Sequence, residues 1–182
     1  MISIKNSKIL VTGGAGFIGG HLVAELVKSG ARVIVVDIEV NSRSTFALND
    51  LRSKVILEFV DIRDRKKVFS VFKKYRPAYV LHLAADPIVA SAYNDPYNAF
   101  ETNIMGTVNV LEAARATKSI KGIIVASSDK AYGKTDKAYT EESPLRADHP
   151  YDVSKACADL ISQAYFKTYG LPATITNTSN NY

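Results

Sequence analysis

The chain has 182 residues, enough for one domain with a sizeable core, and 47% of them are hydrophobic, which excludes a disordered protein. The single cysteine, Cys157, excludes an internal disulfide framework. No run approaches membrane-spanning length and the amino terminus lacks a signal-peptide pattern, so we expect a cytoplasmic protein without a membrane partner.

Much of the net charge of +5 comes from residues 63–74, which carry six lysine and arginine side chains. This run could mark a nucleic-acid surface. Apolar residues recur in it at helical spacing, however, which is typical of an amphipathic helix with a solvated basic face: Val68, Val71, Phe72 and Tyr75. No basic patch interleaved with aromatic residues accompanies the run, so we expect no nucleic-acid partner.

Strand and helix patterns alternate from start to finish. Continuous β-branched and aliphatic runs predict buried parallel strands at 8–12, 32–37, 55–60, 79–83, 122–127 and 173–178. Helical patterns fall at 17–29, 64–75, 97–117 and 151–169, and the polar connection 38–54 has room for a short helix. This order predicts an α/β fold, a Rossmann-type doubly wound parallel sheet with helices on both faces.

The first strand leads into a glycine-rich turn. The apolar run 9–11 is followed by Gly13, Gly16 and Gly19, and a helical pattern begins at once. Glycines let the backbone turn tightly and approach a pyrophosphate, whose charge is met by free N–H groups and the positive end of the helix. Alone, such a pattern is a weak signal.

The second strand strengthens this interpretation because it ends in Asp37. In a dinucleotide-binding unit, an acid at this place accepts from the ribose hydroxyls and repels a 2′-phosphate, which favours NAD over NADP. Arg43 is near in sequence and could soften that preference. The alternative is a glycine-rich turn of another α/β protein, with Asp37 as a surface cap.

The ends of the other strands supply further candidates. Asp61, followed by Ile62, could accept from an adenine amino group or cap the next helix. Small residues after the fourth strand would keep a groove open for a flat cofactor, although they are also common in cores: Leu83, Ala84 and Ala85.

The fifth strand ends in a hydroxyl, an acid and an amine, at a place where a substrate would lie: Ser127, Ser128, Asp129 and Lys130. The long polar connection 129–150 follows, and long loops in compact domains are usually functional or disordered. We expect this loop to take part in binding.

Tyr151 and Lys155 lie four residues apart at the start of a helix, so they share one face. A phenol has a reference pKa of about 10, too high for a base near neutral pH. A neighbouring ammonium and an oxidised nicotinamide both favour the phenolate. Taken alone, the four-residue spacing favours a tyrosine at a helix start and an exposed lysine over a catalytic pair.

Together, three segments resemble the extended short-chain dehydrogenase/reductase family: 12–19 (TGGAGFIG), 127–133 (SSDKAYG) and 151–155 (YDVSK). Within it, they look most like the nucleotide-sugar 4,6-dehydratases, especially the CDP-glucose type. The resemblance covers essentially the whole chain and implies a single NAD-binding Rossmann domain over residues 1–182.

The resemblance assigns roles to matching positions. The expected NAD site comprises Gly13, Gly16, Phe17, Ile18, Gly19, Asp37, Asp61, Ile62, Leu83, Ala84, Ala85, Asn103 and Lys155. Asn103 matches an asparagine that often supports the active-site lysine, and Asn180 matches one near the diphosphate of the nucleotide-sugar substrate. No metal is implied.

The resemblance also implies a reaction. Ser128 would bond to the sugar C4 oxygen and Tyr151 would take the C4 hydroxyl proton, while Lys155 would lower the pKa of Tyr151. Asp129 as acid and Lys130 as base would then eliminate water across C5 and C6, and the hydride held by NAD would return to C6. Lys130 would need burial or a cationic neighbour to be neutral. Epimerases need no such pair, so dehydration is favoured; a 4-epimerase and a non-catalytic NAD-binding protein stay open.

The sequence also departs from the family. Family members continue past the position of Tyr182 with a segment that builds the sugar-nucleotide pocket. They also usually have an arginine near the last strand, and Asn177 stands near that place in this chain. The chain therefore looks like the cofactor half of an enzyme. The family implies a homodimer through helices 97–117 and 151–169. Ile104, Val108 and Leu111 could form its apolar stripe or could face the sheet.

Overall fold

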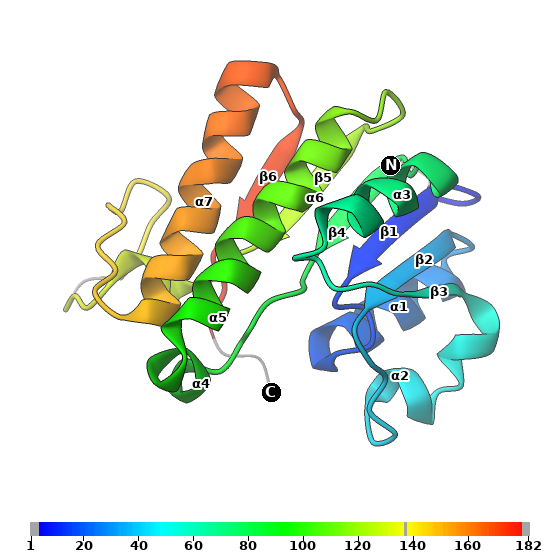
Figure 1. The fold of residues 1–182 in the computed structure, drawn as a ribbon, viewed down its shortest axis with the longest axis horizontal. Helices are drawn as coiled ribbons and strands as arrows, with labels where there is room; N and C mark the ends of the chain where they lie inside the picture. Colours follow the sequence, from blue (N-terminus) through cyan, green and yellow to red (C-terminus); the bar gives the residue numbers. More distant parts are fainter. Residues whose placement is uncertain (1–3, 137, 180–182) are drawn as a thin grey trace.

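The computed structural model describes residues 4–136 and 138–179. Six parallel strands form one sheet in the order β3-β2-β1-β4-β5-β6 (Figure 1). They are β1 Lys8–Thr12, β2 Arg32–Asp37, β3 Ile56–Phe59, β4 Tyr79–His82, β5 Gly122–Ala126 and β6 Ala173–Thr176. The predicted doubly wound sheet is confirmed, with its switch point between β1 and β4. The last four strands end one or two residues earlier than predicted.

Helices cover both faces of the sheet (Figure 1). On one face lie α1 (Phe17–Lys28) and α2 (Thr45–Leu48), followed by a 3₁₀ turn, η1 (Leu51–Lys54). On the other face lie α3 (Arg65–Tyr75), α6 (Gly106–Arg115) and α7 (Pro150–Tyr169).

Two hydrophobic cores result, because both faces of the central strands are covered. Ile9 and Val11 pack towards α1, whereas Leu10 between them packs towards α3 and α6. All three are almost completely buried. A strand buried on both faces needs apolar residues at consecutive positions, which explains its unbroken aliphatic run.

The helix predicted over 97–117 is wrong in detail, because it is three elements. Helix α5 (Pro96–Phe100) starts at a proline, and the Asp95 side chain caps it by accepting from the Asn98 N–H. A π-helical turn, η2 (Glu101–Met105), then leads into α6, and a further short helix, α4 (Val89–Asn94), precedes them. A π turn is a wider turn of backbone and is frequent at functional sites.

The apolar stripe proposed for a dimer surface does not lie on one outward face. Leu111 is completely buried in the core, while Ile104 and Val108 are partly buried. Leu111 therefore faces the sheet, as the alternative interpretation allowed.

The basic segment forms α3, with Val68, Val71 and Phe72 buried and its lysines outward. This confirms the amphipathic interpretation. Asp64 caps α3 by accepting from the Lys67 N–H, so the interpretation of Asp61 as the cap is wrong.

Candidate functional site

A cavity of about 750 Å³ lies at the carboxyl edge of the sheet, where the segments after all six strands meet. Most predicted site residues line it: Gly13, Gly16, Phe17, Ile18, Gly19, Asp37, Asp61, Ile62, Leu83, Ala84, Ala85, Ser128 and Tyr151. Asn103 and Lys155 are buried and do not line it. Asp129 and Lys130 do not line it either, and Asn180 lies outside the described residues.

The glycine turn packs too tightly for side chains. Gly13 has φ +68°, and a Cβ there would lie 2.7 Å from the Ala84 nitrogen. A Cβ on Gly19 would lie 2.1 Å from the Gly13 oxygen. Helix α1 starts after Gly16, which has no side chain to cap it. The first N–H groups of α1 are thus suited to an anion at the cavity wall.

Asp37 connects the end of β2 to this turn. Its carboxylate accepts from the Ala15 N–H at 2.9 Å and from the Ile38 N–H at 2.8 Å. Burial raises the pKa of Asp37, although these N–H bonds lower it. The Asp37 carboxylate therefore lies in the cavity wall next to the glycine turn, not on the outer surface as a cap would.

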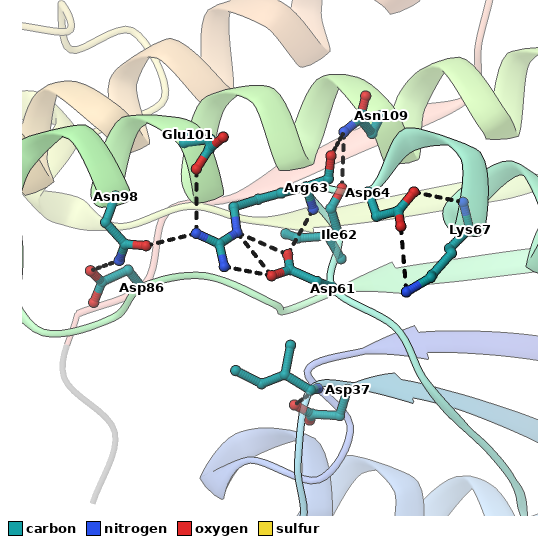
Figure 2. A network of polar contacts seen from close by, with 11 residues as sticks. Asp37, Asp61, Ile62, Arg63, Asp64, Lys67, Asp86, Asn98, Glu101 and Asn109 are labelled. Carbon is teal, nitrogen blue, oxygen red and sulfur yellow. Dashed lines mark hydrogen bonds and ion pairs between the residues drawn. The ribbon is translucent and has the colours of Figure 1, made fainter.

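Asp61 is already bonded by a side chain that the sequence did not single out. Arg63, two residues on, donates to both of its carboxylate oxygens and keeps its pKa below the usual range (Figure 2). Behind this loop, the buried amide of Asn109 donates to the carbonyl oxygens of Ile62 and Arg63. Ile62 packs against Gly106, where a Cβ would lie 2.5 Å from the Ile62 Cδ1.

His82, on β4, was not predicted as a site residue. It is 2% exposed, its Nδ1 lies 2.6 Å from the Thr12 hydroxyl and its Nε2 lies 3.0 Å from that of Thr107. The Ala84 N–H donates to the same Thr12 hydroxyl. Burial, with the nearby Lys155 charge, lowers the pKa of His82 to about 3. A neutral imidazole thus connects β1, the Ala84 wall of the cavity and the helix that follows η2.

Asn103 supports the site, but through other partners than the resemblance implied. Its amide accepts from the Asp86 N–H at 2.7 Å and donates to the Asp86 carbonyl and, at 2.8 Å, to the Ser154 hydroxyl. Ser154 donates to the Tyr151 carbonyl. Among the hydrogen bonds of the described residues, Asn103 therefore connects the loop after β4 to the start of α7, and not to Lys155 itself.

Tyr151 and Ser128 meet across the cavity. A hydrogen bond with Ser128 lowers the pKa of Tyr151, but burial raises it by more, and the carboxylates of Asp152, Asp129 and Asp86 add to the rise. The net shift is upward, so the expected lowering by Lys155 is not found among the described groups.

Lys155 is buried behind the cavity. Its Nζ donates to the Ala126 carbonyl oxygen at 2.6 Å, and burial lowers its pKa to about 8. Its own carbonyl accepts from the Ser127 hydroxyl. These two bonds connect α7 to the end of β5, and they direct the ammonium to a backbone oxygen.

The acid and amine after β5 are less enclosed. Asp129 accepts from the Ser128 hydroxyl at 3.2 Å, and both Asp129 and Lys130 lie in a 3₁₀ turn, η3 (Asp129–Tyr132). Lys130 is exposed, so burial, one of the two conditions that could make it neutral, is not present at this residue. Asn177 donates to Tyr132 and to the buried Asp159.

A second cavity, of about 1090 Å³, lies between α3 and α6 at the opposite edge of the sheet and contains none of the predicted site residues. Within 4–136 and 138–179, no group of acidic, histidine or cysteine side chains is placed to bind a metal ion. None of the helices in those ranges is both long and apolar enough to cross a bilayer.

The fold and the carboxyl-edge cavity define a Rossmann-type protein with a hydroxyl and a phenol lining that cavity. The sequence model described as GDP-mannose 4,6 dehydratase matches residues 10–182. The chain therefore belongs to the GDP-mannose 4,6-dehydratase family.

Curated relatives are dehydratases. The chain is 39% identical to the dTDP-glucose 4,6-dehydratase of Neisseria meningitidis serogroup B, over 96% of this chain and 53% of the relative. It is 32% identical to the CDP-glucose 4,6-dehydratase of Salmonella typhimurium, over 93% and 48%. The chain thus spans about half the length of the curated relatives it matches.

Solved structures include both dehydratases and epimerases. The dTDP-glucose 4,6-dehydratase of Streptomyces venezuelae, solved with NAD and TYD bound, superimposes with a TM-score of 0.85 at 34% identity, covering 96% of this chain and 56% of that one. The UDP-glucose 4-epimerase of Brucella ovis, in complex with NAD, gives 0.85 at 28% identity, over 96% and 52%.

Proposed function

We propose that this chain binds NAD at the carboxyl edge of its sheet and supplies the residues that oxidise C4 in a nucleotide-sugar 4,6-dehydratase, a lyase. One observation carries the proposal: a single cavity contains the glycine turn, Asp37, Ser128 and Tyr151. A dinucleotide-binding wall and a hydroxyl–phenol pair therefore face the same space. Dehydratase relatives and neighbours solved with NAD support it.

The cavity wall offers hydrogen-bond donors and acceptors suited to a dinucleotide. At the turn, positions 13 and 19 leave no room for a Cβ, and the uncapped start of α1 offers N–H groups to a pyrophosphate. Asp37 offers carboxylate oxygens to a ribose diol and disfavours a 2′-phosphate, which supports NAD over NADP. We propose that residues 1–182 together form one cofactor-binding domain.

Ser128 and Tyr151 would act on the sugar. Ser128 donates to the C4 oxygen, and Tyr151 takes the C4 hydroxyl proton. When bound, NAD would accept the hydride from C4, return it at C6 after water has left, and add a positive charge that opposes the carboxylates around Tyr151. Asp129 protonates the departing C6 hydroxyl, and Lys130 removes the proton from C5. The role of Lys130 has the least structural support, because its side chain is exposed.

That exposure favours a second candidate, a nucleotide-sugar 4-epimerase, which needs no base at C5. Epimerases also occur among the solved structures that superimpose on this chain. The protein should be incubated with NAD and with dTDP-, CDP-, GDP- and UDP-glucose. A 4-keto-6-deoxy product supports dehydration, and a C4-inverted sugar that retains its C6 hydroxyl supports epimerisation.

Binding is tested separately from chemistry by calorimetric titration of NAD and NADP. We expect NAD to bind more tightly and Asp37→Ala to remove most of that preference. Absence of heat with either dinucleotide, for a folded sample, contradicts the proposal. Binding without turnover of any sugar nucleotide supports instead the non-catalytic NAD-binding protein.

A homodimer stays a prediction. Leu160 on α7 and Met105 on η2 are 55% and 51% exposed, which is consistent with a covered surface on those helices. Sedimentation of the wild type and of Leu160→Asp would test it, since the predicted dimer dissociates when a charge enters its interface.

A further inference from the structure

The guanidinium of Arg63 lies in the cavity wall and bonds to side chains of three elements. Figure 2 shows it extending from the loop after β3 to α5 and η2, with Asp37 on the other side of the cavity from Asp61. Its Nη1 donates to the Asn98 side-chain oxygen at 2.9 Å and to Glu101 at 3.3 Å. The Asn98 nitrogen in turn donates to Asp86 at 3.1 Å. Arg63 therefore connects the loop after β3 to α5 and η2 along the wall of the cavity that faces Asp37.

The same guanidinium determines the position of the Asp61 carboxylate. Nη2 donates to Oδ2 at 2.6 Å, and Nε lies 2.9 Å from Oδ2 and 3.0 Å from Oδ1. The Arg63 backbone N–H donates to Oδ1 at 2.8 Å. A planar fork on both oxygens fixes the plane of a carboxylate, which a lysine ammonium cannot do.

These contacts leave the Asp61 carboxylate few lone pairs that can accept a further hydrogen bond. A carboxylate has about four lone-pair sites, and three donors of Arg63 occupy most of them. The carboxylate is still partly exposed, with 32% of its side chain accessible, and Asp61 lines the cavity. The remaining site can accept one hydrogen bond from a donor in the cavity, and because the carboxylate is ionised it repels a carbonyl oxygen there.

We propose that Arg63 is a positioning residue for base recognition: by fixing the plane and charge of the Asp61 carboxylate, it makes the groove select a dinucleotide whose purine carries a 6-amino group over one with a 6-oxo group. The inference rests on the proposed NAD site. Arg63 touches Asp61 and the braces Asn98 and Glu101, and it acts on the base through Asp61.

The test compares NAD with nicotinamide hypoxanthine dinucleotide, in which an oxygen replaces the 6-amino group, by calorimetric titration. We expect the wild type to bind NAD about tenfold more tightly or better, the effect of one hydrogen bond to a charged group. Arg63→Gln should reduce this ratio to within about threefold, mainly by weakening NAD. Asp61→Asn should also lose the preference, because an amide can donate to the 6-oxo group.

Arg115→Gln is the matched control. Arg115 forms a similar two-bond pair with Glu112, at 2.8 and 3.0 Å, and neither residue lines the cavity. This variant should keep the wild-type ratio. Arg63→Lys, which retains the charge without the fork, should give an intermediate ratio and replaces Arg63→Gln if the latter fails to fold.

The outcomes separate the inference from the proposed function. If the wild type binds neither dinucleotide, the NAD site itself is wrong. If the wild type binds both equally, or if Arg63→Gln weakens both by the same factor, Arg63 only connects structural elements and the inference is overturned.

Discussion

Acid should destabilise this protein through one buried imidazole, that of His82. The Thr107 hydroxyl donates to the Asn103 carbonyl at 2.6 Å, so it can only accept from the His82 Nε2–H. The Thr12 hydroxyl accepts from the Ala84 N–H and donates to Nδ1. The hydrogen bonds of both ring nitrogens are complete only in the neutral ring, because a proton on Nδ1 would displace the Thr12 hydroxyl hydrogen from its acceptor.

The magnitude follows from the change in pKa. Folding lowers the pKa of His82 from 6.5 to about 3, so between these values the unfolded chain binds a proton that the folded chain does not. The contribution of the neutral His82 ring to the free energy of unfolding is therefore complete above pH 6.5 and is lost as the pH falls from 6.5 towards 3. At about 1.4 kcal/mol for each pH unit, His82 costs about 2 kcal/mol between pH 7 and pH 5.

Urea unfolding at pH 7 and pH 5 measures this loss, with His82→Gln as the comparison. Glutamine can donate and accept but does not titrate, so the variant is less stable at pH 7 and loses about 2 kcal/mol less on acidification. His21 and His149 are common to both proteins. If wild type and variant lose the same stability between the two pH values, the reasoning about a buried neutral ring is refuted.

Three further outcomes are expected. Gly19→Ala places a Cβ 2.1 Å from the Gly13 oxygen and should abolish NAD binding in a titration, and undiminished affinity would contradict the tight turn. Lys155→Met should remove a pH dependence of stability. Burial lowers the pKa of Lys155 from 10.5 to about 8. The free energy of unfolding of the wild type, measured in urea, should therefore rise by about 2 kcal/mol relative to the variant between pH 8 and pH 10. Gly106→Val collides with Ile62, 2.5 Å from the added Cβ, and should cost about 1–3 kcal/mol in the free energy of unfolding and weaken NAD binding, whereas an unchanged midpoint would show that the loop yields freely.

The residues that face the cavity could be predicted because of how parallel sheets are built. Each strand delivers its loop to the same edge, so the residues just after Thr12, Val36 and Ala126 meet in space although they are far apart in sequence. Short motifs at strand ends are therefore visible in a single sequence. The glycine turn, Asp37 and Ser128 were found in this way, whereas Tyr151 was found from its spacing to Lys155 at the start of α7.

The supporting contacts could not be predicted, even for Asn103, which the family resemblance singled out, because they join distant elements. His82 bonds to Thr12, 70 positions away, and Asn103 bonds to Ser154, 51 positions away. Neither pair has a spacing that a local pattern would reveal. The π turn of η2 is similarly hidden, since its sequence continues the helical pattern of α6.

Arg63 shows how composition can mislead about a single residue. It belongs to the basic run whose lysines lie on the solvated face of α3, and in sequence nothing separates it from them. In the structure it precedes that helix, and four of its five side-chain N–H groups have partners in Asp61, Asn98 and Glu101. One position in a charge run can therefore connect several elements while the lysines next to it lie on an exposed helix face, and the difference is set by which carboxylates the loop after β3 brings within reach.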